Sequence, residues 1–195
     1  MNLPNVLTIT RIILSPIFIF FFMLESFPMR VTGLAIFVIA ALTDVADGHY
    51  ARKRGVITGF GKFMDPLADK ILVSSALVSF TSLDFVSPLP VMLIIAREFS
   101  ITGLRLLVAY KGVIISPSPG AKFKTFMQMW SIILILVYFS LVSAFEFYGV
   151  SPSPLAGFDA KLYAHWILWI TAIATVWTGL DYVIKYFSVI RSVLR

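Results

Sequence analysis

Six apolar runs, separated by polar breaks of which four of the five contain proline, constrain this chain more than any other feature of its sequence. The runs lie at about 12–24, 31–47, 66–80, 89–109, 125–147 and 162–184. A helix of about 20 apolar residues spans a bilayer. Of the 195 residues, 59% are hydrophobic, which is more than a soluble domain of this size can bury. We therefore expect an all-α integral membrane protein with six transmembrane helices, forming one domain over residues 1–195.

Most basic residues follow the second, fourth and sixth runs. They are Arg52, Lys53, Arg54, Lys62, Lys111, Lys122, Lys124, Lys185, Arg191 and Arg195, whereas the opposite loops carry only Arg30 and Lys161. Because Lys and Arg concentrate in cytoplasmic loops, we expect a multi-pass protein of the cytoplasmic membrane with both termini in the cytoplasm. The net charge of +6 then reflects topology and does not indicate a nucleic-acid partner. The absence of cysteine excludes disulfides and thiolate chemistry.

Four of the ten acidic residues lie at the junction of the second and third runs: Asp44, Asp47, Asp65 and Asp69. Carboxylates at a bilayer boundary are costly unless something compensates them. The i, i+3 and i, i+4 spacings place each pair on one helix face, so two adjacent helices could direct all four into one pocket. Oxygen ligands without His or Cys favour Mg²⁺, Mn²⁺ or Ca²⁺ over zinc. The alternative is that Asp65 caps a helix that starts at Pro66, which leaves the other three aspartates unexplained.

The same segment reads Asp-x-x-Asp-Gly-x-x-Ala-Arg, then eight residues, then Gly-x-x-x-Asp-x-x-x-Asp. The defined positions are Asp44, Asp47, Gly48, Ala51, Arg52, Gly61, Asp65 and Asp69. This pattern resembles, without gap or substitution, the signature of the CDP-alcohol phosphotransferase family. Members of that family are six-helix membrane enzymes of similar size, which displace CMP from a CDP-alcohol with the hydroxyl of a second alcohol. The resemblance therefore implies a metal-dependent transferase with two divalent cations, Mg²⁺ or Mn²⁺, and an active site at the cytoplasmic side.

The resemblance also assigns roles to residues. It makes Asp44, Asp47 and Asp65 metal ligands, and Asp69 both a ligand and the general base, although a carboxylate beside two cations is a weak base. It places Asn5, Thr8, Gly48, Ala51, Arg52, Thr58 and Gly61 at the CDP-lipid. All of these except Thr58 have a plainer interpretation: the glycines and Ala51 suit helix packing, Arg52 belongs to a positive-inside cluster, and Asn5 with Thr8 could cap a helix.

Four later cations suggest a site for a phosphorylated acceptor on the cytoplasmic side: Arg97, Arg105, Lys122 and Lys124. Within the family, this part of the sequence most resembles the members that transfer a phosphatidyl group from CDP-diacylglycerol to sn-glycerol 3-phosphate. The products of that reaction are phosphatidylglycerophosphate and CMP, and it belongs to phospholipid biosynthesis. Ala121 departs from the glycine usual there. Arg97 could instead form a structural ion pair with Glu98. The two lysines could be a snorkelling flank.

Two other functions fit parts of the pattern. The same chemistry could use inositol phosphate, phosphatidylglycerol or serine as acceptor, and of these inositol phosphate would use four cations equally well. A protein of a different class, a divalent-cation transporter, could line an ion path with carboxylates, but the later runs contain no second carboxylate layer. Members of the family are often homodimers, so the resemblance leaves a homodimer open.

Overall fold

The protein is described here from a computed structural model, which covers residues 3–54, 59–110, 119–150, 159–188 and 191. Side chains are described for these residues except at 3–4, 44–54, 60, 62, 110 and 119–124. These ranges form six helices and no strand. The helices are α1 (Leu3–Met23), α2 (Phe27–Arg54), α3 (Gly59–Ser82), α4 (Pro88–Tyr110), α5 (Pro119–Phe147) and α6 (Ala160–Lys185). The predicted all-α fold with six helices is confirmed, one helix for each apolar run.

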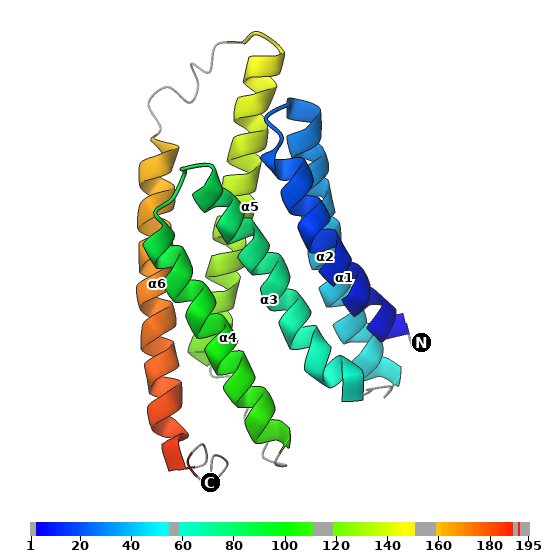
Figure 1. The fold of residues 1–195 in the computed structure, drawn as a ribbon, viewed down its shortest axis with the longest axis vertical. Coiled ribbons are helices and arrows are strands. Elements are labelled where there is room, and N and C mark those ends of the chain that lie inside the picture. The colour runs from blue at the N-terminus through cyan, green and yellow to red at the C-terminus, as the bar shows by residue number, and fades with distance from the viewer. Residues whose placement is uncertain (1–2, 55–58, 111–118, 151–158, 189–190, 192–195) are drawn as a thin grey trace.

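The helices alternate in direction, so the molecule has two distinct ends (Figure 1). We call the end at which α1, α3 and α5 begin and α2, α4 and α6 finish the lower end, as drawn in Figure 1, and the opposite end the upper end. Helix α1 packs along α2 and α3, and α4 packs between α3 and α6. Segments far apart in the sequence therefore meet at the lower end.

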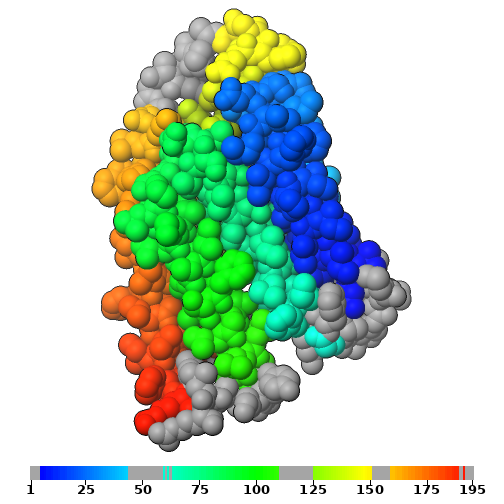
Figure 2. Space-filling view, viewed as in Figure 1, coloured from blue at the N-terminus to red at the C-terminus, as the bar shows by residue number. Residues whose placement is uncertain are grey.

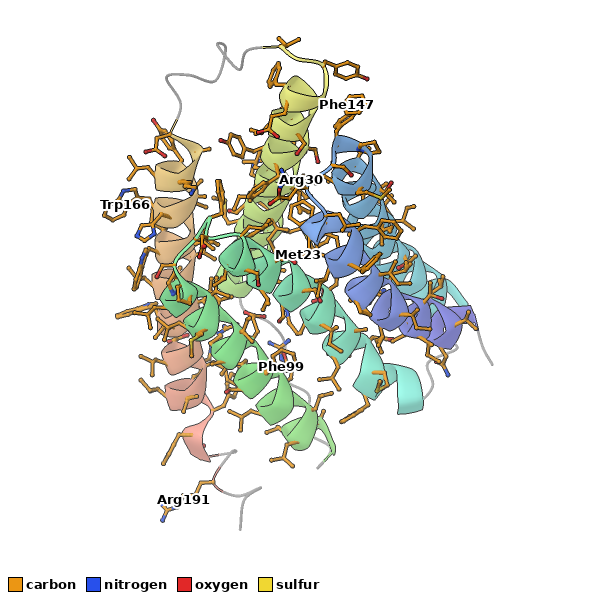
Figure 3. All side chains as sticks on the ribbon, turned by 45° about the horizontal axis from the view of Figure 1, so that its top comes forward. Met23, Arg30, Phe99, Phe147, Trp166 and Arg191 are labelled. Atoms are coloured by element: carbon orange, nitrogen blue, oxygen red, sulfur yellow. The ribbon has the colours of Figure 1, made fainter. Side chains whose placement is uncertain are left out.

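The surface distribution of side chains is that of a protein in lipid. Large apolar side chains face outward, among them Phe20, Trp130, Ile173 and Trp177, while small hydroxyl residues such as Ser75, Ser79, Ser140 and Thr175 are buried between helices. Trp166 likewise points away from α6 (Figure 3). Small polar residues at helix contacts and an apolar exterior are typical of transmembrane bundles. Residues Asn5–Met23, Thr125–Phe147 and Ala160–Lys185 are long and apolar enough to cross a membrane, so we describe the chain as a multi-pass membrane protein.

Aromatic packing holds the upper half of the bundle together. The ring of Phe22 lies edge-on to Phe80 and Phe139, with centroid distances of 6.1 and 5.7 Å. Beside it, Gly33 lets α2 approach α1, because a Cβ there would lie 3.0 Å from both the Cβ and the backbone nitrogen of Phe22. Edge-to-face ring pairs add to the stability gained from burying the rings. This packing fixes α1, α2, α3 and α5 relative to one another.

The start of α3 differs from the prediction. We expected a helix that begins at Asp65 and Pro66, but α3 begins at Gly59, and Pro66 lies inside it. Asp65 is therefore not the N-cap of α3, and that interpretation was wrong. A proline in a membrane helix removes one backbone N–H, and neighbouring groups can compensate for the loss. Helix α1 also begins earlier than the first predicted span, since residues Pro4 to Arg11 belong to it.

Candidate active site

The two carboxylates of α3 lie on one face of the helix, and Asp65 contacts the first turns of α1. Asp65 and Asp69 are four positions apart in the helix and are both half-buried. The hydroxyl of Thr8, which is fully buried, donates a hydrogen bond to Oδ1 of Asp65. The structure thus brings together one residue predicted for the CDP-lipid and one predicted for metal binding.

Two other predicted CDP-lipid residues lie close by in the fold. Asn5 is half-buried in the first turn of α1, one turn before Thr8. Gly61 is buried in α3, one turn before Asp65 and on the same face. A residue without a side chain at that position leaves room for a ligand or a neighbouring backbone beside the carboxylate.

The other half of the motif lies in the last three turns of α2. Asp44, Asp47, Gly48, Ala51 and Arg52 all fall within this helix, and α2 packs on both α1 and α3. Their side chains are outside the described set, as is the whole of Thr58. The helix directions bring the end of α2 and the start of α3 to the same lower end, as the predicted meeting of the two aspartate pairs requires.

The described ligand atoms suit a hard divalent cation. Among the described side chains, no group of three His, Asp or Glu residues is placed to hold a metal ion. Asp65 and Asp69 contribute two carboxylates on one helix face, and oxygen ligands of this kind are those preferred by Mg²⁺ and Mn²⁺. The donor set therefore fits the predicted cations, with the α2 aspartates needed to complete the site.

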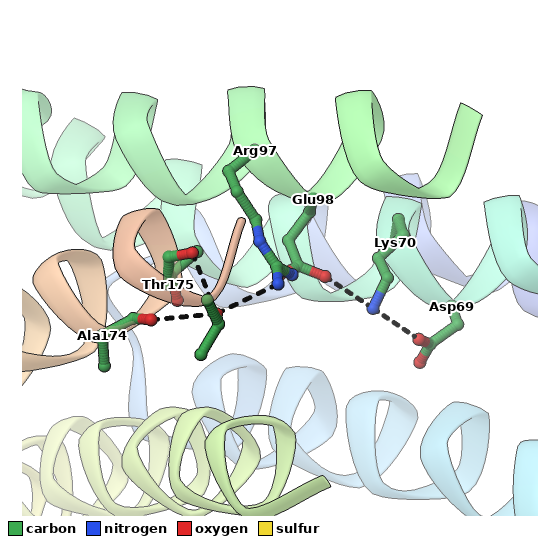
Figure 4. A network of polar contacts seen from close by, with 7 residues as sticks. Asp69, Lys70, Arg97, Glu98, Ala174 and Thr175 are labelled. Atoms are coloured by element: carbon green, nitrogen blue, oxygen red, sulfur yellow. Dashed lines mark hydrogen bonds and ion pairs between the residues drawn. The ribbon is translucent and has the colours of Figure 1, made fainter. Parts of the chain in front are cut away.

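A chain of charged contacts leads from Asp69 to α4 and α6 (Figure 4). The ammonium of Lys70 lies 3.2 Å from Oδ2 of Asp69 and 2.8 Å from Oε2 of Glu98. The other oxygen of Glu98 accepts a hydrogen bond of 2.9 Å from Nη1 of Arg97, whose Nη2 donates to Thr178 Oγ1 at 3.1 Å. The predicted pairing of Arg97 with Glu98 is thus observed, within a larger chain of contacts.

The second arginine of α4 is held by a ring and by no carboxylate in the described part of the chain. The guanidinium carbon of Arg105 lies 5.9 Å from the ring centroid of Tyr182 on α6. Its Nε is buried and has no hydrogen-bond partner among the described residues. A cation held this way keeps its charge available for an anion.

The two predicted lysines begin the next helix. Lys122 and Lys124 lie in the first two turns of α5, at the lower end. Their side chains are outside the described set. Figure 2 shows that the outline of the lower end is notched between the first turns of α3 and the last turns of α4.

Four residues of this region were not predicted as parts of a site: Lys70, Thr178, Gly179 and Tyr182. Lys70 was visible only as the neighbour of Asp69. The small pair Thr178 and Gly179 within an apolar run is a signal for close helix contact, but it does not say which helix is contacted. Here the contact is α4, since a Cβ at Gly179 would lie 3.0 Å from Cγ of Arg97.

The site thus has an acidic side and a basic side, contributed by different helices. Asp65 and Asp69 on α3 can bind cations, while Arg97 and Arg105 on α4 can bind anions. Lys70 and Glu98 connect the two sides. Such an arrangement suits a reaction in which a metal-bound polyphosphate meets an acceptor that is itself anionic.

Comparison with known proteins gives consistent matches over nearly the whole chain. The sequence profile of the family described as CDP-alcohol phosphatidyltransferase matches residues 1–177. The chain is 38% identical to the CDP-diacylglycerol–glycerol-3-phosphate 3-phosphatidyltransferase of Rickettsia typhi, over 93% of this chain and 94% of that protein. It is 36% identical to the protein of the same name from Bacillus subtilis, over 98% of each chain. A probable phosphatidylglycerophosphate synthase of Mycobacterium tuberculosis is 36% identical over 94% of this chain and 81% of its own length.

Proposed function

Because this chain belongs to the CDP-alcohol phosphatidyltransferase family, we propose that it transfers the phosphatidyl group of CDP-diacylglycerol to sn-glycerol 3-phosphate. The products are phosphatidylglycerophosphate and CMP. The observation that carries this proposal is the acidic α3 face and the basic α4 face, which meet through Lys70 and Glu98. The relatives named for this reaction cover almost the whole chain, which supports the choice of acceptor.

We assign the acidic residues to metal and nucleotide binding. Asp44, Asp47, Asp65 and Asp69 would hold two divalent cations, Mg²⁺ or Mn²⁺, which neutralise the pyrophosphate and stabilise the departing CMP. The residues assigned to the CDP-lipid head are Asn5, Thr8, Gly48, Ala51, Arg52, Thr58 and Gly61. The hydrogen bond from Thr8 to Asp65 supports this grouping, because it ties the first turns of α1 to the carboxylates.

The transfer step needs a base and no covalent intermediate. Asp69 takes the proton from the acceptor hydroxyl as that oxygen forms a bond to the phosphorus of the phosphatidyl group. The bond from this phosphorus to the CMP oxygen breaks, and CMP leaves with the electron pair. Since Lys70 lies against Oδ2 of Asp69, we assign the proton transfer to Oδ1.

The acceptor phosphate is assigned to the basic side. Arg97 uses one hydrogen of each terminal nitrogen for Glu98 and Thr178, which leaves the second hydrogen of each for an anion. Arg105 supplies a further guanidinium, and Lys122 and Lys124 at the start of α5 add two ammonium groups. Four cations match a phosphate better than a neutral or zwitterionic acceptor such as serine.

The lower end is assigned to the cytoplasm. The basic residues that follow α2, α4 and α6 support this orientation, since Lys and Arg favour cytoplasmic loops. It places both termini and the site on the side where the water-soluble acceptor and CMP are found. We assign the chain to the cytoplasmic membrane on the same grounds.

The test is CMP release by the purified protein in detergent with CDP-diacylglycerol and Mg²⁺. The acceptors compared are glycerol 3-phosphate, inositol 1-phosphate, serine and phosphatidylglycerol, and the variants are Asp69→Asn and, as a matched control at the upper end, Asp84→Asn. We expect release with glycerol 3-phosphate alone, lost in Asp69→Asn and kept in Asp84→Asn. Release with another acceptor only would contradict the acceptor, and Mg²⁺ flux in liposomes without any CMP release would favour a transporter.

A further inference from the structure

Five side chains from three helices form one unbroken chain of polar contacts. We call it the contact chain: Asp69, Lys70, Glu98, Arg97 and Thr178. Its members alternate in charge from the Asp69 carboxylate to the Arg97 guanidinium, so the four charges sum to zero. The contact chain ends at the neutral hydroxyl of Thr178 in α6.

The centre of the contact chain is closed to solvent. Glu98 is 4% exposed, and its two oxygens are used by different cations, Oε2 by Lys70 and Oε1 by Arg97. A carboxylate shared in this way fixes the two cations relative to each other. Because Lys70 also contacts Asp69, the position of the Asp69 carboxylate is tied to that of the Arg97 guanidinium.

Helix α6 holds the far end of the contact chain. The hydroxyl of Thr178 accepts a hydrogen bond from Arg97 and itself lies 2.9 Å from the carbonyl of Ala174. Next to it, the missing side chain of Gly179 makes room for Arg97, whose Cγ and Nε would lie 3.0 and 3.2 Å from a Cβ there. The arginine is therefore held from both sides, by Glu98 within α4 and by the Thr178–Gly179 pair of α6.

Stability alone does not account for four charges in this place. Apolar residues of similar volume often stabilise a buried contact as well as an ion pair does, or better. A buried arginine can also be held without a carboxylate from the described residues, as Arg30 is by Ser143 and Phe139 in the same protein. What the contact chain does in addition is connect the proposed base to the proposed acceptor ligand.

We propose that Lys70, Glu98 and Thr178 are positioning residues that set the placement of Asp69 relative to Arg97, so that glycerol 3-phosphate held at Arg97 presents its hydroxyl to Asp69. This inference rests on the proposed function. It gives α6, which contributes none of the family motif, a part in acceptor binding. None of the three residues needs to touch the substrate to have this effect.

The inference predicts a specific split of kinetic constants, measured by CMP release with each substrate varied in turn. Glu98→Gln removes the charge that holds both cations, and we expect kcat to fall about 30-fold and the KM for glycerol 3-phosphate to rise about tenfold. The KM for CDP-diacylglycerol should stay within about twofold. A purely structural role would lower the amount of folded enzyme and leave both KM values unchanged.

Thr178 supplies a milder test that does not depend on a buried charge. Thr178→Val keeps the volume but removes the hydroxyl, and we expect the KM for glycerol 3-phosphate to rise about threefold. Thr178→Ser retains the hydroxyl and should match the wild type. Since both changes act through Arg97, Glu98→Gln combined with Thr178→Val should raise this KM by less than the product of the single effects.

The outcomes separate the inference from the proposed function. If the wild-type chain releases no CMP with glycerol 3-phosphate, the proposed function fails, and the inference with it. If the wild type is active but the variants raise both KM values equally, or leave both unchanged, the inference alone is overturned. Thermal unfolding of each variant in the same detergent reports folding separately.

Discussion

The two halves of the bundle hold an inward-facing arginine in different ways. At the upper end, Arg30 of α2 donates to Ser143 of α5 at 2.6 Å, and its guanidinium lies 5.3 Å from the ring centroid of Phe139. It lies inside the bundle between these helices (Figure 3). Nearer the lower end, Arg97 is held by Glu98 and Thr178, and through Glu98 it connects to Lys70.

The difference teaches how a buried charge relates to function in this protein. Arg30 contacts a hydroxyl and a ring, which hold it locally and connect two helices. Arg97 contacts a carboxylate that leads on to the proposed base. A buried cation within the membrane is therefore not by itself a sign of chemistry. The partner decides the role, and each prediction below compares a residue of the lower end with a counterpart.

Among the comparisons between the two ends, the largest effect is expected from two aspartates near helix starts. Asp159 caps α6 by accepting a 3.0 Å hydrogen bond from the Leu162 nitrogen, whereas Asp65 lies inside α3 and accepts one from Thr8. Asp65→Asn should lower kcat/KM by about 100-fold or more, because it removes a proposed metal ligand. Asp159→Asn should stay within about twofold, since Asn caps a helix as well as Asp does.

CMP release at fixed, subsaturating substrate measures both variants. Raising the Mg²⁺ concentration serves as a control, because it should restore part of the Asp65→Asn activity if metal affinity is what was lost. Equal losses in the two variants would show that Asp65 acts only on the fold, as Asp159 does.

The next comparison is between Arg97 and Arg30. Arg97→Lys keeps the charge but loses the planar fork that reaches Glu98 and Thr178 together. We expect the KM for glycerol 3-phosphate to rise about tenfold. Arg30→Lys should leave both KM values within about twofold and lower the unfolding midpoint in detergent by about 3 °C, since its contacts only hold α2 against α5.

Steady-state kinetics and thermal unfolding are measured on the same preparations. The comparison would be broken if Arg30→Lys changed the acceptor KM as much as Arg97→Lys. It would be strengthened if Arg97→Lys changed only the acceptor KM and Arg30→Lys changed only the unfolding midpoint.

The fold could be predicted from the sequence because membrane spans are set by local composition. Each of the six apolar runs became one helix. The bounds of the helices could not be predicted, because apolar composition shows only which part of a helix lies in lipid. A helix continues beyond that part into polar residues. Thus α1 begins at Leu3 and α3 at Gly59, and the proline at 66, a plausible helix start, lies within the second of these.

Only those features of the site that follow from residue spacing could be predicted from the sequence. The i, i+4 pair of Asp65 and Asp69 follows from helix geometry, and the pairing of Arg97 with Glu98 was a stated alternative that the structure bears out. The contact of Arg97 with Thr178 on α6 was not predictable, because it depends on how two helices cross some eighty residues apart in sequence. Whether the four predicted acceptor cations gather in one pocket stays a prediction.

The next comparison is between three glycines, which differ in what an added methyl group would contact. At Gly33 a Cβ would press on the Phe22 backbone at 3.0 Å, at Gly179 on the flexible side chain of Arg97, and at Gly103 on nothing within 4 Å. Gly33→Ala should lower stability by about 1–3 kcal/mol through overpacking and leave KM unchanged. Gly179→Ala should raise the KM for glycerol 3-phosphate about threefold by displacing the guanidinium, with little loss of stability.

Gly103→Ala is the matched control, and both its kinetics and its unfolding midpoint should equal those of the wild type. The prediction for Gly179 fails if its variant loses stability as Gly33→Ala does while keeping the acceptor KM. That result would place Gly179 with the structural contacts of the upper end.

The smallest effect is expected at Tyr182. Its variants test whether α6 binds the acceptor directly or only positions other residues. Within the described part of the chain its hydroxyl is buried without a hydrogen-bond partner, and its ring lies against the guanidinium of Arg105. Removing an unsatisfied hydroxyl is neutral or stabilising, so Tyr182→Phe should keep the KM for glycerol 3-phosphate within about twofold and leave the unfolding midpoint unchanged or higher. Tyr182→Leu removes the ring face and should raise this KM about threefold.

A fivefold or larger rise in the acceptor KM of Tyr182→Phe would contradict this expectation. It would mean that the hydroxyl has a partner only when the acceptor is bound, since the protein itself offers it none in the described residues. Helix α6 would then belong to the basic side of the site as a ligand, and not only as the support that Thr178 and Gly179 give to Arg97. The difference between the two ends would extend to α6, whose upper turns pack while its lower turns bind.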